Sequence, residues 1–143
     1  MATLILEYFR VVEIWNSITV KGGEAITDRA GKYLRVDGTT GKAMLGNATS
    51  ATEVGTLRGI ALTDEKHLGD SVTLLRNGLA DFGNALDGMD YGEAIFLSDT
   101  DGTLADAAGT VTTALVGYVW PVFEHDGTVK KLAMIDTTTV IGA

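Results

Sequence analysis

The sequence predicts an all-β protein, a small β-barrel or β-sandwich built from two related hairpin units and preceded by an N-terminal arm. The 143 residues include 18 Gly and a single Pro, which favours many strands joined by tight turns. Short runs rich in Val, Ile, Leu, Thr and Tyr alternate with Asp-Gly and Asn-Gly pairs, and these pairs favour the positive φ angles of hairpin turns. The tetrapeptide Gly-Glu-Ala-Ile occurs at residues 23–26 and again at residues 92–95. Each copy leads into apolar residues, an Asp-Gly turn and a glycine-centred apolar strand. We therefore expect the same β-unit to occur twice in the fold.

A strongly apolar segment precedes the first copy. Residues 4–15 hold nine apolar side chains out of twelve. Their spacing fits a helix, and their β-branched and aromatic content fits a strand equally well, so both remain open. In either form the segment must cover apolar surface on its own domain or on a neighbour. We therefore divide the chain into residues 1–20, an N-terminal arm or contact segment, and residues 21–143, the β-barrel domain.

Apolar runs on either side of turn residues predict strand pairs along the rest of the chain. The expected pairs are 72–76 with 79–82, 94–98 with 103–105, and 118–124 with 129–135. The last pair is the clearest, because the polar turn at residues 125–128 separates two long apolar runs.

Small polar residues form the expected loops. The stretches 48–53 and 106–110 occupy matching places in the two units, just before the glycine-centred strands, and we expect both on one rim of the barrel. The tail, residues 137–143, is β-prone and is expected to add an edge strand or to reach a partner.

Composition argues against several classes of protein. The formal net charge of −8 opposes a nucleic-acid surface, because such binding draws its affinity from Lys and Arg. The absence of cysteine excludes disulfides and thiolate metal sites. No apolar run approaches the roughly 20 residues of a membrane helix, and the N-terminus lacks the basic and small residues of a signal peptide. We expect a soluble protein, made in a cytoplasm, with no nucleic-acid and no membrane partner.

Two motifs resemble ligand-binding loops, but each lacks residues that such a loop requires. Residues 38–43 superficially match a phosphate-binding loop, but Val36 stands where the first glycine is required and Ala43 where the magnesium-binding hydroxyl is required. Residues 99–102 resemble the start of a calcium loop, yet the ligand series does not continue. Both are interpreted as turns, the second held by Asp side chains.

No arrangement of residues predicts catalysis. The two histidines, His67 and His125, lie far apart in polar turns, and the serines lack a nucleophile elbow. Carboxylates are abundant, but no pair is set apart by an apolar surrounding that would raise a pKa, which leaves a glycoside hydrolase as a remote alternative. We expect no enzyme, no catalytic residue, no cofactor and no metal site.

Trp120 precedes the only proline, Pro121, inside a strand-like run. A proline there indicates an edge or a bulge, where a ladder N–H is dispensable. We interpret Trp120 as a residue of the core or of a subunit interface rather than as a platform for a ligand.

Five motifs in succession resemble the small capsid decoration, or cement, proteins of tailed bacteriophages. They are Gly-Glu-Ala-Ile, Asp-Gly-x-x-Gly-Lys-Ala, Leu-Arg-Gly-Ile-Ala-Leu-Thr-Asp, Gly-Asp-Ser-Val-Thr-Leu-Leu-Arg-Asn-Gly and Gly-Glu-Ala-Ile-Phe-Leu-Ser-Asp-Thr-Asp-Gly, at residues 23–26, 37–43, 57–64, 69–78 and 92–102. The resemblance spans about residues 20 to 120, and it rests on strands and turns rather than on a catalytic signature.

The resemblance implies a homotrimer on the outer surface of an icosahedral head, synthesised in the host bacterial cytoplasm, that bridges and stabilises major capsid protein subunits. It further implies that an N-terminal arm augments a strand of the capsid protein or clasps a neighbouring subunit. The expected capsid or subunit interface consists of large apolar residues, namely Leu4, Leu6, Tyr8, Phe9, Val11, Ile14, Trp15 and Trp120. The alternative is a phage tail or fibre β-module that binds a host glycan through Trp120 and nearby tyrosines.

Overall fold

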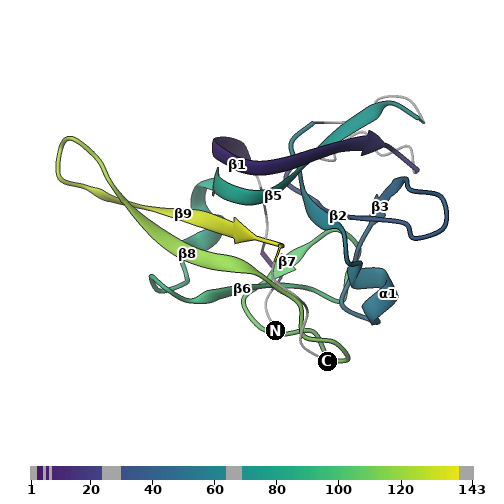
Figure 1. The fold of residues 1–143 in the computed structure, drawn as a ribbon. Coiled ribbons are helices and arrows are strands. Elements are labelled where there is room, and N and C mark those ends of the chain that lie inside the picture. Colours follow the sequence, from purple (N-terminus) through teal and green to yellow (C-terminus); the bar gives the residue numbers. More distant parts are fainter. Residues whose placement is uncertain (1–2, 5, 7, 24–29, 64–68, 139–143) are drawn as a thin grey trace.

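The computed structural model describes residues 3–4, 6, 8–23, 30–63 and 69–138. Strands account for 48% and helices for 7% of these residues, and the strands form one antiparallel sheet that curls into a half-barrel (Figure 1). The strands are β1 (Arg10–Lys21), β2 (Tyr33–Val36), β3 (Ala43–Leu45), β4 (Arg58–Ala61), β5 (Ser71–Asp81), β6 (Ala94–Leu97), β7 (Leu104–Ala105), β8 (Leu115–Phe123) and β9 (Val129–Asp136). Two single-turn helices are described, α1 (Ala51–Val54) and η1 (Gly83–Leu86).

The sheet is organised around the long strand β5. The hydrogen-bonded order is β3-β2-β4-β5-β9-β8-β6-β7, and β1 pairs with β5 in addition. Strands β4 and β9 share one edge of β5, at Leu74–Leu75 and at residues 77–80 respectively, while β1 follows the other edge. From β5 the sheet continues through β4, β2 and β3 on one side and through β9, β8, β6 and β7 on the other, which gives the sheet its curl. Two clusters of buried apolar side chains lie inside the curled sheet.

The core divides into a large and a small cluster of buried side chains. The large cluster gathers residues of β2, β4, β5, β6, β8 and β9 with Phe82 and Leu86, and the small one gathers Leu34, Ala43, Ala61, Val72 and Leu74. Burial of this kind stabilises by about 25 cal/mol per Å² of apolar surface. The clusters do not cover the outer face of β1 or the end of β8 next to the β8–β9 turn.

Two of the three expected strand pairs are confirmed. Strand β6 pairs with β7, and β8 pairs with β9 from Gly117↔Ile135 to Phe123↔Val129. In the turn that joins β8 to β9, the Asp126 carboxylate accepts hydrogen bonds from the N–H and hydroxyl of Thr128, as turn-forming Asp residues commonly do.

The expected pair 72–76 with 79–82 is wrong, because β5 runs without a turn through Asn77 and Gly78. Gly78 lies opposite Ile14, and a Cβ on Gly78 would come within 2.2 Å of the Glu13 carbonyl oxygen of β1. The glycine therefore allows two backbones to approach closely rather than forming a hairpin turn.

Of residues 4–15, left open between helix and strand, residues 10–15 belong to strand β1. Pairing with β5 runs from Arg10↔Asp81 to Lys21↔Ser71. A separate N-terminal arm comprising residues 1–20 is not confirmed, since most of that segment belongs to the sheet. Strand β1 ends beside β3, where the Gly23 N–H donates to the Ala43 carbonyl at 2.8 Å.

Several expected features fall partly or wholly outside the described residues. Residues 24–26 of the first Gly-Glu-Ala-Ile copy, His67, and residues 139–143 of the tail are among them. The second copy, by contrast, leads directly into β6. Helix α1 begins within the expected loop at residues 48–53 and ends at Val54, and its N-terminus is capped by the Ser50 hydroxyl accepting from the Glu53 N–H at 3.2 Å.

Candidate functional site

Strand β1 presents large apolar side chains to solvent. The exposed fractions are 42% for Val12, 52% for Ile14 and 50% for Trp15. The β1–β5 register skips Val12 and Trp15, so each is an extra residue at a β-bulge. Bulges re-aim side chains and are common at sheet edges. Together, Val12, Ile14 and Trp15 form what we call the β1 surface.

The backbone of β1 has a free side. Within the residues that the structure describes, β1 pairs along its length with β5 alone, and the only other bridge at its end joins Gly22 to Ala43. An unpaired strand edge carries N–H and C=O groups that can accept a further strand. The bulges at Val12 and Trp15 limit how long such a strand could remain in register.

A second apolar surface lies on the β8–β9 hairpin, which extends away from the rest of the sheet (Figure 1). Because Val119 is buried and side chains alternate along a strand, Tyr118 and Trp120 face outward, with exposed fractions of 38% and 44%. Phe123, next to the turn, is 74% exposed. Pro121 lies beyond the part of β8 that pairs with β6, in accord with the edge position expected for it.

The eight predicted interface residues divide by exposure. Four are partly buried and pack against the large core cluster: Leu4, Leu6, Phe9 and Val11. The Phe9 ring lies 5.8 Å from the Phe82 ring. Four are exposed: Tyr8, Ile14, Trp15 and Trp120. Only the exposed four remain available for a partner, and their role at an interface stays a prediction.

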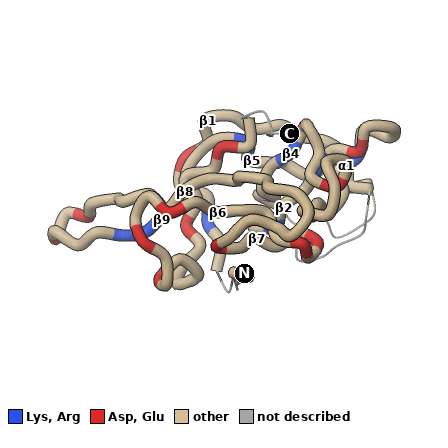
Figure 2. The backbone as a smooth tube through the Cα atoms, turned by 90° about the horizontal axis from the view of Figure 1, so that it is seen from below, with Lys and Arg blue, Asp and Glu red and all other residues tan. Residues whose placement is uncertain are grey.

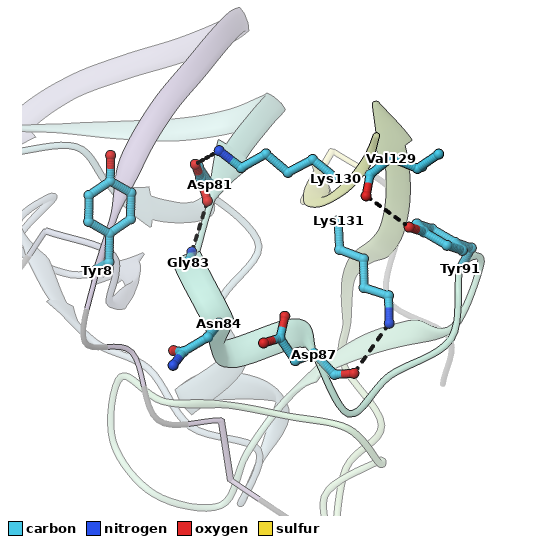
Figure 3. A pocket seen from close by; sticks show the side chains of 9 residues that line it. All are labelled: Tyr8, Asp81, Gly83, Asn84, Asp87, Tyr91, Val129, Lys130 and Lys131. Atoms are coloured by element: carbon cyan, nitrogen blue, oxygen red, sulfur yellow. Dashed lines mark hydrogen bonds and ion pairs between the residues drawn. The ribbon is translucent and has the colours of Figure 1, made fainter. Parts of the chain in front are cut away.

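An open pocket of about 560 Å³ lies between the start of η1 and the beginning of β9, next to the turn of the β8–β9 hairpin. Figure 3 shows Tyr8 on one side of it and Tyr91 on the other, with Asn84 and Asp87 between them. The exposed fractions of the two tyrosines are 48% and 47%. The other lining residues are Asp81, Gly83, Val129, Lys130 and Lys131.

Asp81 is a nearly buried carboxylate at the edge of this pocket. It lies 2.7 Å from the Lys130 ammonium and 3.7 Å from the Arg10 guanidinium, and it accepts the Gly83 N–H at 2.8 Å. Burial favours the neutral acid, but the hydrogen bonds from Lys130 and Gly83 and the charges of Lys130 and Arg10 outweigh it, so the pKa of Asp81 is lowered. The same pairing raises the pKa of Lys130. Asp81 thus ties β1, β9 and the start of η1 together.

Lys131 and Tyr91 form the opposite wall. The Lys131 ammonium donates to the carbonyl oxygens of Met89 at 2.5 Å and Asp87 at 3.3 Å, and it lies 5.3 Å from the centre of the Tyr91 ring. The Tyr91 hydroxyl donates to the Val129 carbonyl at 3.4 Å. These contacts tie the ring to β9 while about half of the residue stays exposed.

Charges of both signs are interspersed here. Figure 2 shows acidic and basic residues close together along the β8–β9 hairpin. Asp81 and Asp87 match Lys130 and Lys131 in number. The pocket therefore carries no large excess of either charge.

Sequence reasoning missed this pocket. One signal was present: Asp81 stands between the apolar residues Ala80 and Phe82, at the end of a strand whose last four residues are buried, and buried carboxylates are almost always paired. Its partners, Lys130 and Arg10, are distant in the chain, and nothing local identifies them.

The two loop-like motifs are turns in the structure. The N–H groups of Thr39 and Thr40 donate to the Asp37 carboxylate at 3.1 and 2.8 Å, which lowers the pKa of that group. At residues 99–102 the turn is held by Ser98, whose hydroxyl accepts the Thr100 N–H at 3.0 Å, and not by Asp side chains as expected. The Asp99 carboxylate accepts the N–H of the more distant Thr110 at 3.2 Å. In the part of the chain that the structure describes, no group of three His, Asp or Glu residues is placed to hold a metal ion.

No helix among the described residues is long and apolar enough to span a membrane. No protein-family model, no curated protein and no solved structure matches the chain.

Proposed function

We propose that the protein is a virion structural protein of the capsid decoration type, which binds the outside of an icosahedral phage head as a homotrimer and bridges major capsid protein subunits. The observation that carries the proposal is the β1 surface, where Ile14 and Trp15 are each at least half exposed on a strand with a free edge. Exposed apolar groups of this size on an edge strand mark a contact with another protein.

The proposed contact combines apolar burial with strand addition. A strand from a capsid subunit or a neighbouring copy pairs with the free edge of β1, while Ile14 and Trp15 enter its surface. Each contact is small, and many copies on one shell give strong total binding. The part of residues 1–20 that makes contact is then β1 itself, because Leu4, Leu6 and Phe9 pack on the core of the same chain.

The proposal includes two related hairpin units. In the first, β2 pairs with both β3 and β4, and in the second, β6 pairs with both β7 and β8. The two pairing schemes are alike, which supports a repeated scaffold, and β4 and β8 join the two units to β5 and β9.

The test is a pair of substitutions that leave the core intact. Ile14→Ser with Trp15→Ser should reduce co-sedimentation with empty expanded heads, assembled from the major capsid protein of the same genome, at least tenfold. Val111→Ser is the matched control, because Val111 is 71% exposed and lies outside β1. Circular dichroism should show that both variants fold. Equal binding by the double variant and the wild-type protein would remove β1 from the contact, and no binding by the wild-type protein would refute the proposal.

Oligomeric state is tested separately by sedimentation equilibrium. The purified protein should have three times the chain mass of 15.0 kDa. A mass that stays at one chain across the accessible concentrations would exclude the homotrimer in solution.

A further inference from the structure

We propose that the pocket between Tyr8 and Tyr91 is a binding site for a neutral carbohydrate. This site is distinct from the β1 surface and goes beyond a role in decorating a capsid. Its volume of about 560 Å³ falls in the range typical of small-molecule sites and has room for one or two sugar rings.

The walls supply apolar contact of the kind that sugars need. Tyr8 and Tyr91 stand on opposite sides, and about half of each side chain is exposed (Figure 3). The C–H groups on one face of a pyranose ring stack on an aromatic ring, whose quadrupole makes the face negative. The Lys131 ammonium lies over the Tyr91 ring, 5.3 Å from its centre, so a sugar stacks on the part of this residue that stays exposed, 47% of it.

The floor supplies polar groups for hydroxyls. Asn84, at the start of η1, is exposed and offers an amide donor and acceptor, and Asp87 offers a carboxylate. Figure 3 shows both side chains between the two tyrosines. Asp81 is nearly buried and fixed by Gly83 and Lys130, so this edge of the pocket is already organised before a ligand enters.

The charge balance selects a neutral ligand. Asp81 is neutralised by Lys130, and the Lys131 ammonium is engaged by two backbone carbonyls. An anion would have to compete with these partners for the lysines. A cation would find one lining carboxylate that is not paired with a lysine, Asp87. A neutral polyhydroxylated molecule can bind without breaking the Asp81–Lys130 pair or the bonds from Lys131 to the two carbonyls. It can also stack on the tyrosine rings.

The experiment measures sugar binding by ligand-observed saturation-transfer NMR and titration. The probes are glucose, galactose, mannose, N-acetylglucosamine and their disaccharides. The wild-type protein should bind at least one with a Kd of about 1 mM, as expected for a small open site. Tyr91→Ala and Asn84→Ala should each weaken that binding at least tenfold, whereas Tyr91→Phe, which keeps the ring, should retain it.

Two controls separate this pocket from the outer face of β8. Tyr118→Ala removes a tyrosine of similar exposure, and Trp120→Ala removes the indole of the β8 face. Neither should change the affinity. The inference is overturned by the absence of binding to every probe, by unchanged affinity in folded Tyr91→Ala and Asn84→Ala, or by loss of binding in Trp120→Ala alone. None of these outcomes bears on shell binding through Ile14 and Trp15, so the two proposals fail independently.

Discussion

Replacing Tyr33 by phenylalanine removes one hydroxyl from the core and produces a stability change with a defined dependence on pH. Tyr33 is completely buried, and its hydroxyl donates to the Val54 carbonyl at 2.6 Å. The bond joins β2 to the end of α1. Because the phenylalanine ring has the same shape, the substitution tests the hydrogen bond with little change in packing.

At neutral pH the variant should be less stable. Without the hydroxyl, the Val54 carbonyl loses this partner in a site closed to water. Leaving a buried acceptor unsatisfied costs about 1–3 kcal/mol, and we expect the free energy of unfolding to fall by that amount for Tyr33→Phe.

At alkaline pH the difference should shrink. Burial is the main cause that raises the pKa of Tyr33 from 10.0 to about 12, although nearby Arg58 opposes it. The unfolded chain therefore releases the phenolic proton first, so the stability due to neutral Tyr33 is complete below pH 10 and is lost as the pH rises toward 12. With 1.36 kcal/mol per pKa unit, the wild-type protein should lose about 1.4 kcal/mol from this group by pH 11, and the variant should lose none of it.

Urea unfolding, followed by circular dichroism between pH 7 and about pH 11, measures both effects. The quantity of interest is the difference in unfolding free energy between the wild-type protein and Tyr33→Phe, because titration of other groups cancels in it. Tyr118→Phe is the control, since Tyr118 is 38% exposed, and its curve should follow the wild-type curve. Parallel curves for the wild-type protein and Tyr33→Phe across this range would refute the assignment of a buried, neutral Tyr33.

Two further changes test other parts of the fold. Asp81→Asn should lower the unfolding free energy by about 1.5–3 kcal/mol at pH 7 by weakening a charge-assisted hydrogen bond. Because the pKa of Asp81 is lowered in the folded state, its contribution is complete above about pH 4 and is lost in stronger acid; a difference that persists undiminished in acid would contradict this sign. Gly117→Ala should destabilise by at least about 1–3 kcal/mol, since a Cβ there would lie 1.9 Å from the Met134 carbonyl oxygen. Gly38→Ala, with open space around it, should change the midpoint of thermal unfolding little, and equal shifts for the two glycine variants would show that the close approach of β8 and β9 is not the cause.

The features predicted well from the sequence were local ones. The hairpin between β8 and β9 needs only apolar runs on either side of a turn that contains Asp126 and Gly127, and the structure has it. The same reasoning failed at Asn77-Gly78, although the dipeptide is a strong turn signal. There the glycine is required by β1, which is more than sixty residues away in the chain and passes close to the β5 backbone.

Composition alone could not tell which residues of the predicted interface face a partner and which pack on the core. Residues 4–15 are evenly apolar, and nothing in their order separates Leu4, Leu6 and Phe9, which pack on the core, from Ile14 and Trp15, which face solvent. The separation depends on where β1 begins to pair with β5 and on the bulges within that pairing.

By itself, the sequence determined the β class, the confirmed hairpins and the positions of the turns at residues 37–40 and 99–102, because turn chemistry and strand alternation act over a few neighbouring residues. Only the tertiary structure decided that residues 10–21 join the sheet, that Gly78 is a point of close backbone contact, and that Asp81 meets Lys130 and Arg10 beside a pocket. Each of these depends on which distant strands pair and in what register. A shift of one residue would turn every side chain of a strand to the other face, so burial, exposure and the candidate sites follow from the assembled sheet.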